Sequence, residues 1–70
     1  MKALTLSTTP GQHPASEVFA FRPIDGDTVG LTHTLEGITA PEHTIKASAA
    51  AVLCRLLLEY GLTPDNGQTA

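Results

Sequence analysis

The sequence predicts an α+β domain in which a three-stranded antiparallel sheet packs on one C-terminal helix. Three segments within residues 2–36 alternate apolar and polar side chains, which is the pattern of a strand with one buried face. A later run, AAAVLCRLLL at 49–58, holds a single charged residue and continues a longer segment that is typical of a helix. The predicted order of elements is therefore β-β-β-α.

The predicted strands are separated by segments rich in turn-forming residues. The cleanest alternation places Val29, Leu31, His33 and Leu35 on one face of the third strand, opposite a face rich in threonine. The segment 9–16, TPGQHPAS, contains two prolines and a glycine and is predicted to be a loop. The three strands are expected at 2–8, 17–24 and 28–36.

An Asp-Gly-Asp turn at 25–27 connects the second and third strands. A turn over its first two residues would send both Phe19 and Phe21 to the threonine face. A three-residue loop instead pairs Phe21 with Leu31 and Phe19 with His33, which gathers the larger apolar groups on one face. We favour the three-residue loop, since a slip of one residue would turn every side chain to the other face.

The helix is predicted to begin at Thr39-Ala40-Pro41-Glu42, which fits a Ser/Thr-x-x-Glu capping box with proline in the first turn. It is expected to run to about Tyr60, where Gly61 offers a left-handed cap. About 21 residues would span about 31 Å. Residues 1–61 are predicted to form a single domain, and 62–70 are predicted to be a disordered tail.

A helical projection separates this helix into a polar band and two apolar faces. The face with larger side chains is expected to cover the sheet; it contains Ile45, Ala49, Val52, Leu53, Leu56 and Tyr60. The second face is predicted to pair two copies of the chain across a two-fold axis, because small residues let helices approach closely. This predicted dimer interface consists of Ala47, Ala50, Ala51, Cys54, Leu57 and Leu58. The alternative is that the alanines reflect helix propensity alone.

Composition argues against several classes of partner. The formal net charge is −3 and the four basic residues are scattered, so binding of duplex nucleic acid is not expected of this chain alone. Binding of nucleic acid by an oligomer is a third possibility, because strand-based readers exist. A single cysteine, Cys54, and an amino terminus without a signal-peptide pattern favour a reducing cytoplasm. The apolar run of ~14 residues is shorter than the ~20 that cross a bilayer, so no membrane partner is predicted.

No residue pattern predicts catalysis, a metal or a cofactor. The three histidines and Cys54 lack the local spacing of metal ligands. The 25–27 turn resembles the start of a calcium loop but lacks the further oxygen ligands and the final glutamate. Neither a nucleophile elbow nor a phosphate-binding glycine loop is present. The protein is therefore predicted not to be an enzyme.

The favoured function is a small protein-interaction module of a regulatory or phage accessory type that binds and modulates another macromolecule, an association made at the level of a protein class. The candidate partner-binding residues are Arg22, Asp25, Asp27, Thr32 and Thr34. The alternative is a small-molecule binding unit or minimal enzyme, with a pocket between helix and sheet lined by Phe19, Phe21, His33 and Tyr60. His33 motivates it as a ligand-facing group on an apolar strand face, although an imidazole bonded to a backbone carbonyl would fit the same position.

Overall fold

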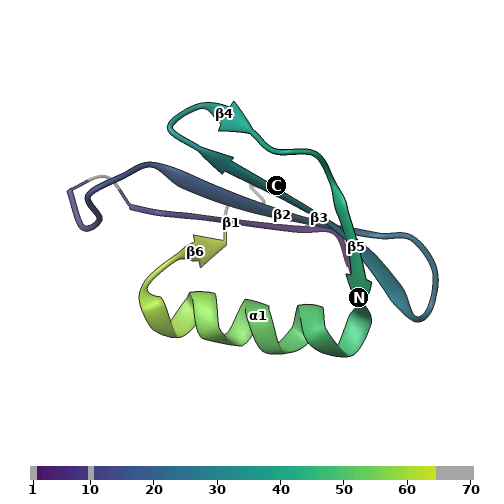
Figure 1. Ribbon diagram of the computed structural model, residues 1–70. Coiled ribbons are helices and arrows are strands. Elements are labelled where there is room, and N and C mark those ends of the chain that lie inside the picture. Colours follow the sequence, from purple (N-terminus) through teal and green to yellow (C-terminus); the bar gives the residue numbers. More distant parts are fainter. Residues whose placement is uncertain (1, 10, 65–70) are drawn as a thin grey trace.

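A six-stranded antiparallel sheet lies against a single helix in the computed structural model, which describes residues 2–9 and 11–64 (Figure 1). The elements in chain order are β1 (Leu4–Ser7), β2 (Glu17–Pro23), β3 (Thr28–Leu35), β4 (Ile38–Thr39), β5 (His43–Lys46), α1 (Ala47–Tyr60) and β6 (Thr63–Pro64). The α+β class with one helix on an antiparallel sheet is confirmed. The predicted number of strands is wrong, because three further short strands, β4, β5 and β6, join the three predicted ones.

The short strands occupy the edges of the sheet. The strand order is β4-β3-β2-β1-β6, and β5 pairs with β3 on the edge that β4 also uses. Along that edge β5 pairs with the beginning of β3 and β4 with its end. A two-residue turn at Glu36-Gly37, with positive φ at both residues, connects β3 to β4 as in the tight hairpins that match strand twist. Short strands of this kind limit the exposed length of a sheet edge.

The β2–β3 hairpin has the predicted register. Phe19 lies opposite His33 and Phe21 lies opposite Leu31. The amide of Ile24 donates a hydrogen bond of 3.0 Å to the carbonyl of Thr28, which closes a loop of three residues. The three-residue loop is therefore confirmed, and both phenylalanines belong to the face of the sheet that α1 covers.

The predicted start of the helix is wrong. Residues 43–46 form β5, in which Ile45 lies opposite Val29, and α1 begins only at Ala47. The amide of Ala47 donates a hydrogen bond of 2.8 Å to the carbonyl of Asp27, so the hairpin tip holds the first turn of the helix. Pairing with the open edge of β3 satisfies backbone groups in both segments, and it outweighs the local preference for a capping box. The predicted cap at Gly61 is confirmed, with φ at 113°.

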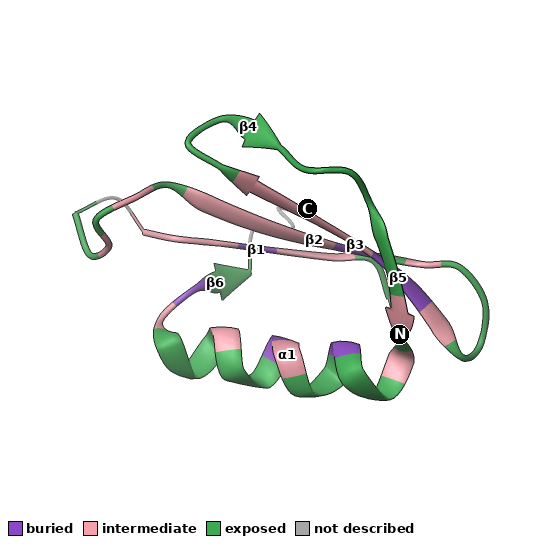
Figure 2. Cartoon of the chain, viewed as in Figure 1, coloured by how far each residue is buried: buried purple, intermediate pink, exposed green. Residues whose placement is uncertain are grey.

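The core shows that the prediction of which helix face covers the sheet is wrong, because the buried residues of α1 belong to the face with small side chains. Large side chains come from the sheet, while α1 contributes the small ones, and the buried positions of α1 all lie on the side toward the sheet (Figure 2). The buried core consists of Leu6, Phe21, Val29, Ala50, Cys54 and Leu62. Because the sheet already supplies bulky groups, alanine and cysteine on α1 allow the helix backbone to lie close to it. Of the face with larger side chains, Ala49, Val52, Leu56 and Tyr60 are exposed, whereas Leu53 packs against the core and Ile45 belongs to β5.

The segment after α1 also belongs to the fold. Leu62 is buried, and β6 pairs with β1 so that Thr63 lies opposite Ser7. The predicted tail is therefore wrong for residues 62–64, and the remainder of that prediction, 65–70, lies outside the described residues. Within the described part of the chain, α1 is too short to cross a membrane.

Candidate functional site

The outward side of α1 carries a row of apolar side chains that we call the α1 stripe: Ala49, Val52, Leu56 and Tyr60. Their spacing of three and four residues places them on one side of the helix. All four are exposed, with 45% of Val52, 50% of Leu56 and 64% of Tyr60 accessible to solvent. Four of the seven large apolar side chains that are exposed in the described residues belong to α1. The stripe is therefore the principal exposed apolar feature of the helix.

Three polar side chains border the stripe on its solvent side, namely Ser48, Arg55 and Glu59. Arg55 and Glu59 are four residues apart, a spacing that brings side chains together on a helix. Neither takes part in an ion pair within residues 2–9 and 11–64. The apolar stripe thus has a charged border whose two charges are opposite in sign.

The structure divides the predicted dimer interface. Ala50 and Cys54 are buried against the sheet, and burial raises the pKa of the Cys54 thiol. Ala47 and Leu57 pack against the core. The last two residues of that predicted interface, Ala51 and Leu58, are exposed on the flank of α1 away from the stripe. The residues chosen from the sequence therefore do not form one free surface, and pairing of two copies stays a prediction.

Arg22, a predicted partner-binding residue, is bound within the chain. Its Nε donates to Glu42 Oε2 at 3.0 Å and its Nη2 donates to Glu42 Oε1 at 2.8 Å. The carboxylate raises the pKa of Arg22, and the guanidinium lowers the pKa of Glu42 by hydrogen bonding. The Glu42 carboxylate occupies the place that a Cβ on Gly30 would need. Both side chains remain partly open to solvent.

The two aspartates at the hairpin tip are used by the turn. Oδ1 of Asp25 accepts hydrogen bonds from the amides of Asp27 at 2.8 Å and Thr28 at 2.9 Å. The bond from Asp27 is the largest cause that lowers the pKa of Asp25. The carboxylate of Asp27 lies 3.6 Å from Nζ of Lys46, beside the start of α1. Turn formation therefore accounts for these residues, as the sequence indicated.

Thr32 and Thr34 lie on the face of the sheet opposite α1. Thr32 is paired with Ala20, and Thr34 is paired with Val18. Oγ1 of Thr34 lies 2.8 Å from Oγ1 of Thr39, which β4 brings to the same face. The sequence predicted the threonine face of β3, but it did not predict that β4 extends this face.

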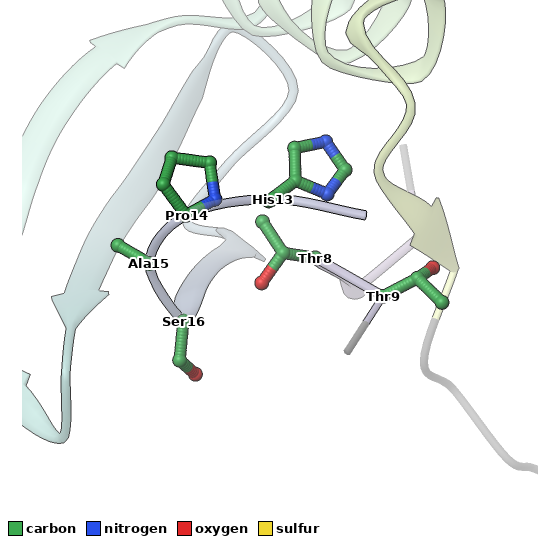
Figure 3. Close-up of a pocket in the computed structure, with 6 residues that line it drawn as sticks. All are labelled: Thr8, Thr9, His13, Pro14, Ala15 and Ser16. Carbon is green, nitrogen blue, oxygen red and sulfur yellow. The ribbon is translucent and has the colours of Figure 1, made fainter. Parts of the chain in front are cut away.

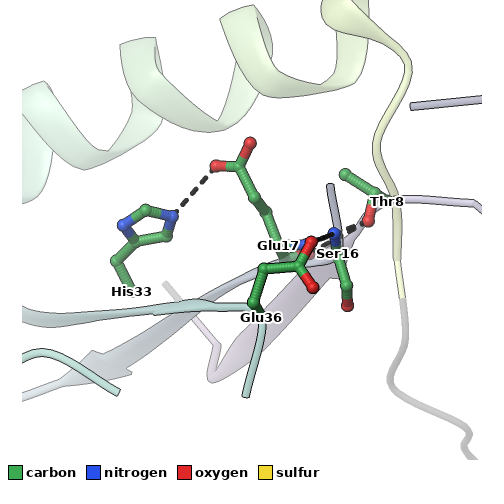
Figure 4. A network of polar contacts seen from close by, with 5 residues as sticks. All are labelled: Thr8, Ser16, Glu17, His33 and Glu36. Atoms are coloured by element: carbon green, nitrogen blue, oxygen red, sulfur yellow. Dashed lines mark hydrogen bonds and ion pairs between the residues drawn. The ribbon is translucent and has the colours of Figure 1, made fainter. Parts of the chain in front are cut away.

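His33 is the residue around which a ligand pocket was predicted, and it has two partners in the chain. Its Nε2 lies 3.0 Å from Glu17 Oε1, and its ring stacks on Phe19 with a centroid distance of 4.3 Å. The side chains of His33 and Glu17 both project from the sheet toward α1 (Figure 4). Glu17 was missed, although the predicted register already placed it two residues from Phe19 on the same face. The partner of His33 is thus a carboxylate.

The other predicted pocket residues are dispersed. Phe21 is buried in the core, whereas Tyr60 lies at the end of α1, where its ring is 5.2 Å from that of His13. The structure therefore brings together only two of the four predicted lining residues, Phe19 and His33. Small-molecule binding around His33 stays a prediction.

A cavity of about 160 Å³ lies in the β1–β2 loop rather than beside His33 (Figure 3). Its lining residues are Thr8, Thr9, His13, Pro14, Ala15 and Ser16. Nε2 of His13 is 3.4 Å from the carbonyl oxygen of Tyr60, and its Nδ1 is enclosed without a hydrogen-bond partner in the described residues. Because a carbonyl only accepts, Nε2 is the nitrogen that carries the hydrogen. His13 thus ties the loop to the end of α1, a contact the sequence gave no signal to predict.

The described residues contain no candidate metal-binding site. Among residues 2–9 and 11–64, no group of three or more histidine, cysteine or acidic side chains is placed to hold a metal ion. The three pairs Arg22–Glu42, His33–Glu17 and Lys46–Asp27 each join one basic and one acidic side chain.

No protein-family model, curated protein or solved structure matches this chain.

Proposed function

We propose that this protein is a non-catalytic interaction module that binds another protein through the α1 stripe. The observation that carries the proposal is the exposure of Val52, Leu56 and Tyr60 in one row on α1. Contiguous apolar surface on a small domain is typical of a protein-binding site. Fully burying a large apolar side chain is worth about 1.5–3 kcal/mol relative to leaving it in water, and a partner would supply about half of that for Val52 or Leu56, which are already half covered.

The shape of the stripe favours a helical or grooved partner surface. Fourteen residues of helix extend about 21 Å, and anchors at successive turns are the arrangement by which a helix docks in an apolar groove. Leu56 is at the middle of the row, with Val52 and Tyr60 one turn away on either side. The neighbouring charges of Arg55 and Glu59 provide the polar rim that protein interfaces usually have.

The polar clusters support a binding role rather than catalysis. Arg22 is held by Glu42, and His33 is held by Glu17, so each basic group already has an acidic partner. Both pairs lie on the sheet, and each links residues that are distant in sequence. These contacts are accounted for by the stability of the fold. Of the large apolar side chains exposed in the described residues, four of seven lie on α1, and the other three are Ile24, Leu35 and Ile38.

The test is to remove the stripe without disturbing the core. The variant V52S/L56S is compared with the control A51S/L58S, which changes exposed residues on the other flank of α1. Each tagged chain is produced in cells of the organism from which the protein comes. The native mass of each chain is then measured in the cell extract by size exclusion with light scattering. We expect wild type and control in assemblies above the 7.3 kDa chain mass, and the stripe variant at that mass.

Thermal unfolding of both variants checks that the fold is retained. A wild-type chain that is monomeric and unbound in the cell extract would contradict the proposal. So would a control variant that loses its assembly to the same extent as V52S/L56S.

A further inference from the structure

We infer that the occupant of the α1 stripe is a second copy of this chain, whose helix packs antiparallel to the first about a two-fold axis near Leu56. This inference rests on the proposed function and identifies the partner of the same surface. It is carried by the symmetry of the stripe and by the charges along its border.

The stripe is self-complementary about its middle. Val52 and Tyr60 are each four residues from Leu56, so an antiparallel copy brings Val52 against Tyr60 of the second copy at both ends. Leu56 then lies against its own counterpart. A two-fold interface requires this property, because the same patch must fit itself after rotation. A smaller side chain opposite a larger one also keeps the two helices evenly spaced.

The charged border selects the antiparallel arrangement. In a parallel pair, the two-fold axis runs along the helices and places the charged borders of the two copies on opposite flanks of the interface, so Arg55 and Glu59 of one copy do not meet those of the second. In the antiparallel pair, Arg55 of one copy lies about 3 Å along the axis from Glu59 of the second copy. The two arginines are then near each other at the centre, with one glutamate on each outer side. Neither residue has an ion pair within the described residues, so both charges are free to make these contacts.

Disulfide trapping tests the geometry directly. Helices that pack 8–10 Å apart, with Cα atoms about 2.3 Å from each axis, leave roughly 3–5 Å between facing Cα atoms. A disulfide requires about 4.4–6.8 Å between Cα atoms, so a cysteine at position 56 can cross-link to its counterpart when the helix axes are about 9–10 Å apart. We use Leu56→Cys in a Cys54→Ala background, and the matched control is Leu58→Cys in the same background. These two leucines are similarly exposed, at 50% and 47%, on different flanks of α1.

Under mild oxidation we expect Leu56→Cys to run at twice the 7.3 kDa chain mass, whereas Leu58→Cys remains at one chain mass. Equal cross-linking of both variants, or cross-linking of Leu58→Cys alone, would overturn the inference. Reducing agent must return the cross-linked species to one chain mass.

Charge reversal gives a second readout that keeps Cys54. Arg55→Glu or Glu59→Arg alone places four like charges along the border, since the two-fold axis doubles each change. We expect each single variant to weaken self-association by about tenfold, measured by sedimentation of the purified full chain. The double variant R55E/E59R is expected to recover it. Double and single variants that associate equally would contradict the antiparallel register.

The two proposals fail in different ways. A purified chain that stays monomeric at about 200 μM, where even a micromolar affinity would populate the dimer, overturns self-pairing. If V52S/L56S still loses its assembly in the cell extract in that case, the stripe binds a different protein, and the proposed function stands.

Discussion

The carboxylate of Glu42 lies across Gly30 and binds the guanidinium of Arg22 through two hydrogen bonds. Glu42 belongs to the segment between β4 and β5, whereas Arg22 is on β2, so the contact passes over β3. A side chain on Gly30 would take the space of the carboxylate. The Arg22–Glu42 pair therefore links the segment between β4 and β5 to β2, across β3. Gly30 permits this contact because it has no side chain.

A double-mutant cycle on Arg22→Gln and Glu42→Gln is expected to show favourable coupling in urea unfolding at low salt. The coupling should fall in about 1 M salt, because both side chains are open to solvent and their charges are screened. In a Gly30→Ala background the new methyl group displaces the carboxylate, and we expect the coupling to vanish. Unchanged coupling in that background would show that Glu42 reaches Arg22 by another route.

Ala50 is the most buried residue of α1 and has no exposed surface. Replacement by leucine inserts three carbon atoms into a filled space, and we expect the free energy of unfolding to fall by about 1–3 kcal/mol. The control Ala51→Leu adds the same atoms at an exposed position and should change stability by less than about 0.5 kcal/mol. Chemical denaturation measures both. Equal losses would mean that the two faces of α1 are not distinguished by burial.

Gly61 ends α1 with φ at 113°, a conformation that side chains disfavour. A Cβ at this position would also approach Nε2 of His13 to 3.3 Å. We expect Gly61→Ala to destabilise the fold by about 1–2 kcal/mol. The control is Gly26→Ala, because Gly26 does not have positive φ and a Cβ there meets no atom within 4 Å. A midpoint shift as large for Gly26→Ala as for Gly61→Ala would refute the role of the cap.

Asp25 is expected to contribute to the acid sensitivity of the protein. Hydrogen bonds from Asp27 and Thr28 lower its pKa, so its carboxylate stabilises the folded state above about pH 4, the pKa in the unfolded chain. That contribution is lost as the pH falls through the lowered folded-state pKa. Asp25→Asn should therefore lose less stability than wild type between pH 6 and pH 3, measured by urea unfolding at each pH.

Asp27→Asn is the control for this pH dependence, since Asp27 is in the same turn but its carboxylate pairs only with Lys46 in the described residues. Glu42 also has a lowered pKa, so some loss of stability in acid is expected to persist in Asp25→Asn. If Asp25→Asn follows the wild-type curve throughout, the turn hydrogen bonds do not govern the pH response.

The predictions that held were those with a local cause. The pairing of Phe19 with His33 follows from alternation in two strands and from the length of the turn between them. The cap at Gly61 follows from one residue that tolerates positive φ. The missed strand β4 had a local signal as well, because Glu36-Gly37 is a two-residue turn, but the strand after it is only two residues long.

The errors arose where two distant segments compete for the same groups. Residues 43–46 fit the predicted helical pattern, yet β3 offers them an open row of backbone partners. The prediction of which face of α1 is exposed was wrong for a similar reason. Both faces of α1 are apolar, and the bulk of Phe21 and Leu6 on the sheet decided which one fits closely. Composition of the helix alone contains no information on that bulk.

By itself, the amino-acid sequence determined the class of fold, the three long strands, the register of their hairpin and the end of the helix, because alternation and turn chemistry act over a few residues. Only the tertiary structure decided that the helix begins at Ala47 and that Val52, Leu56 and Tyr60 face solvent. Those outcomes depend on the free edge of β3 and on the depth of the space above the sheet. Both are properties of elements that meet only after the chain has folded.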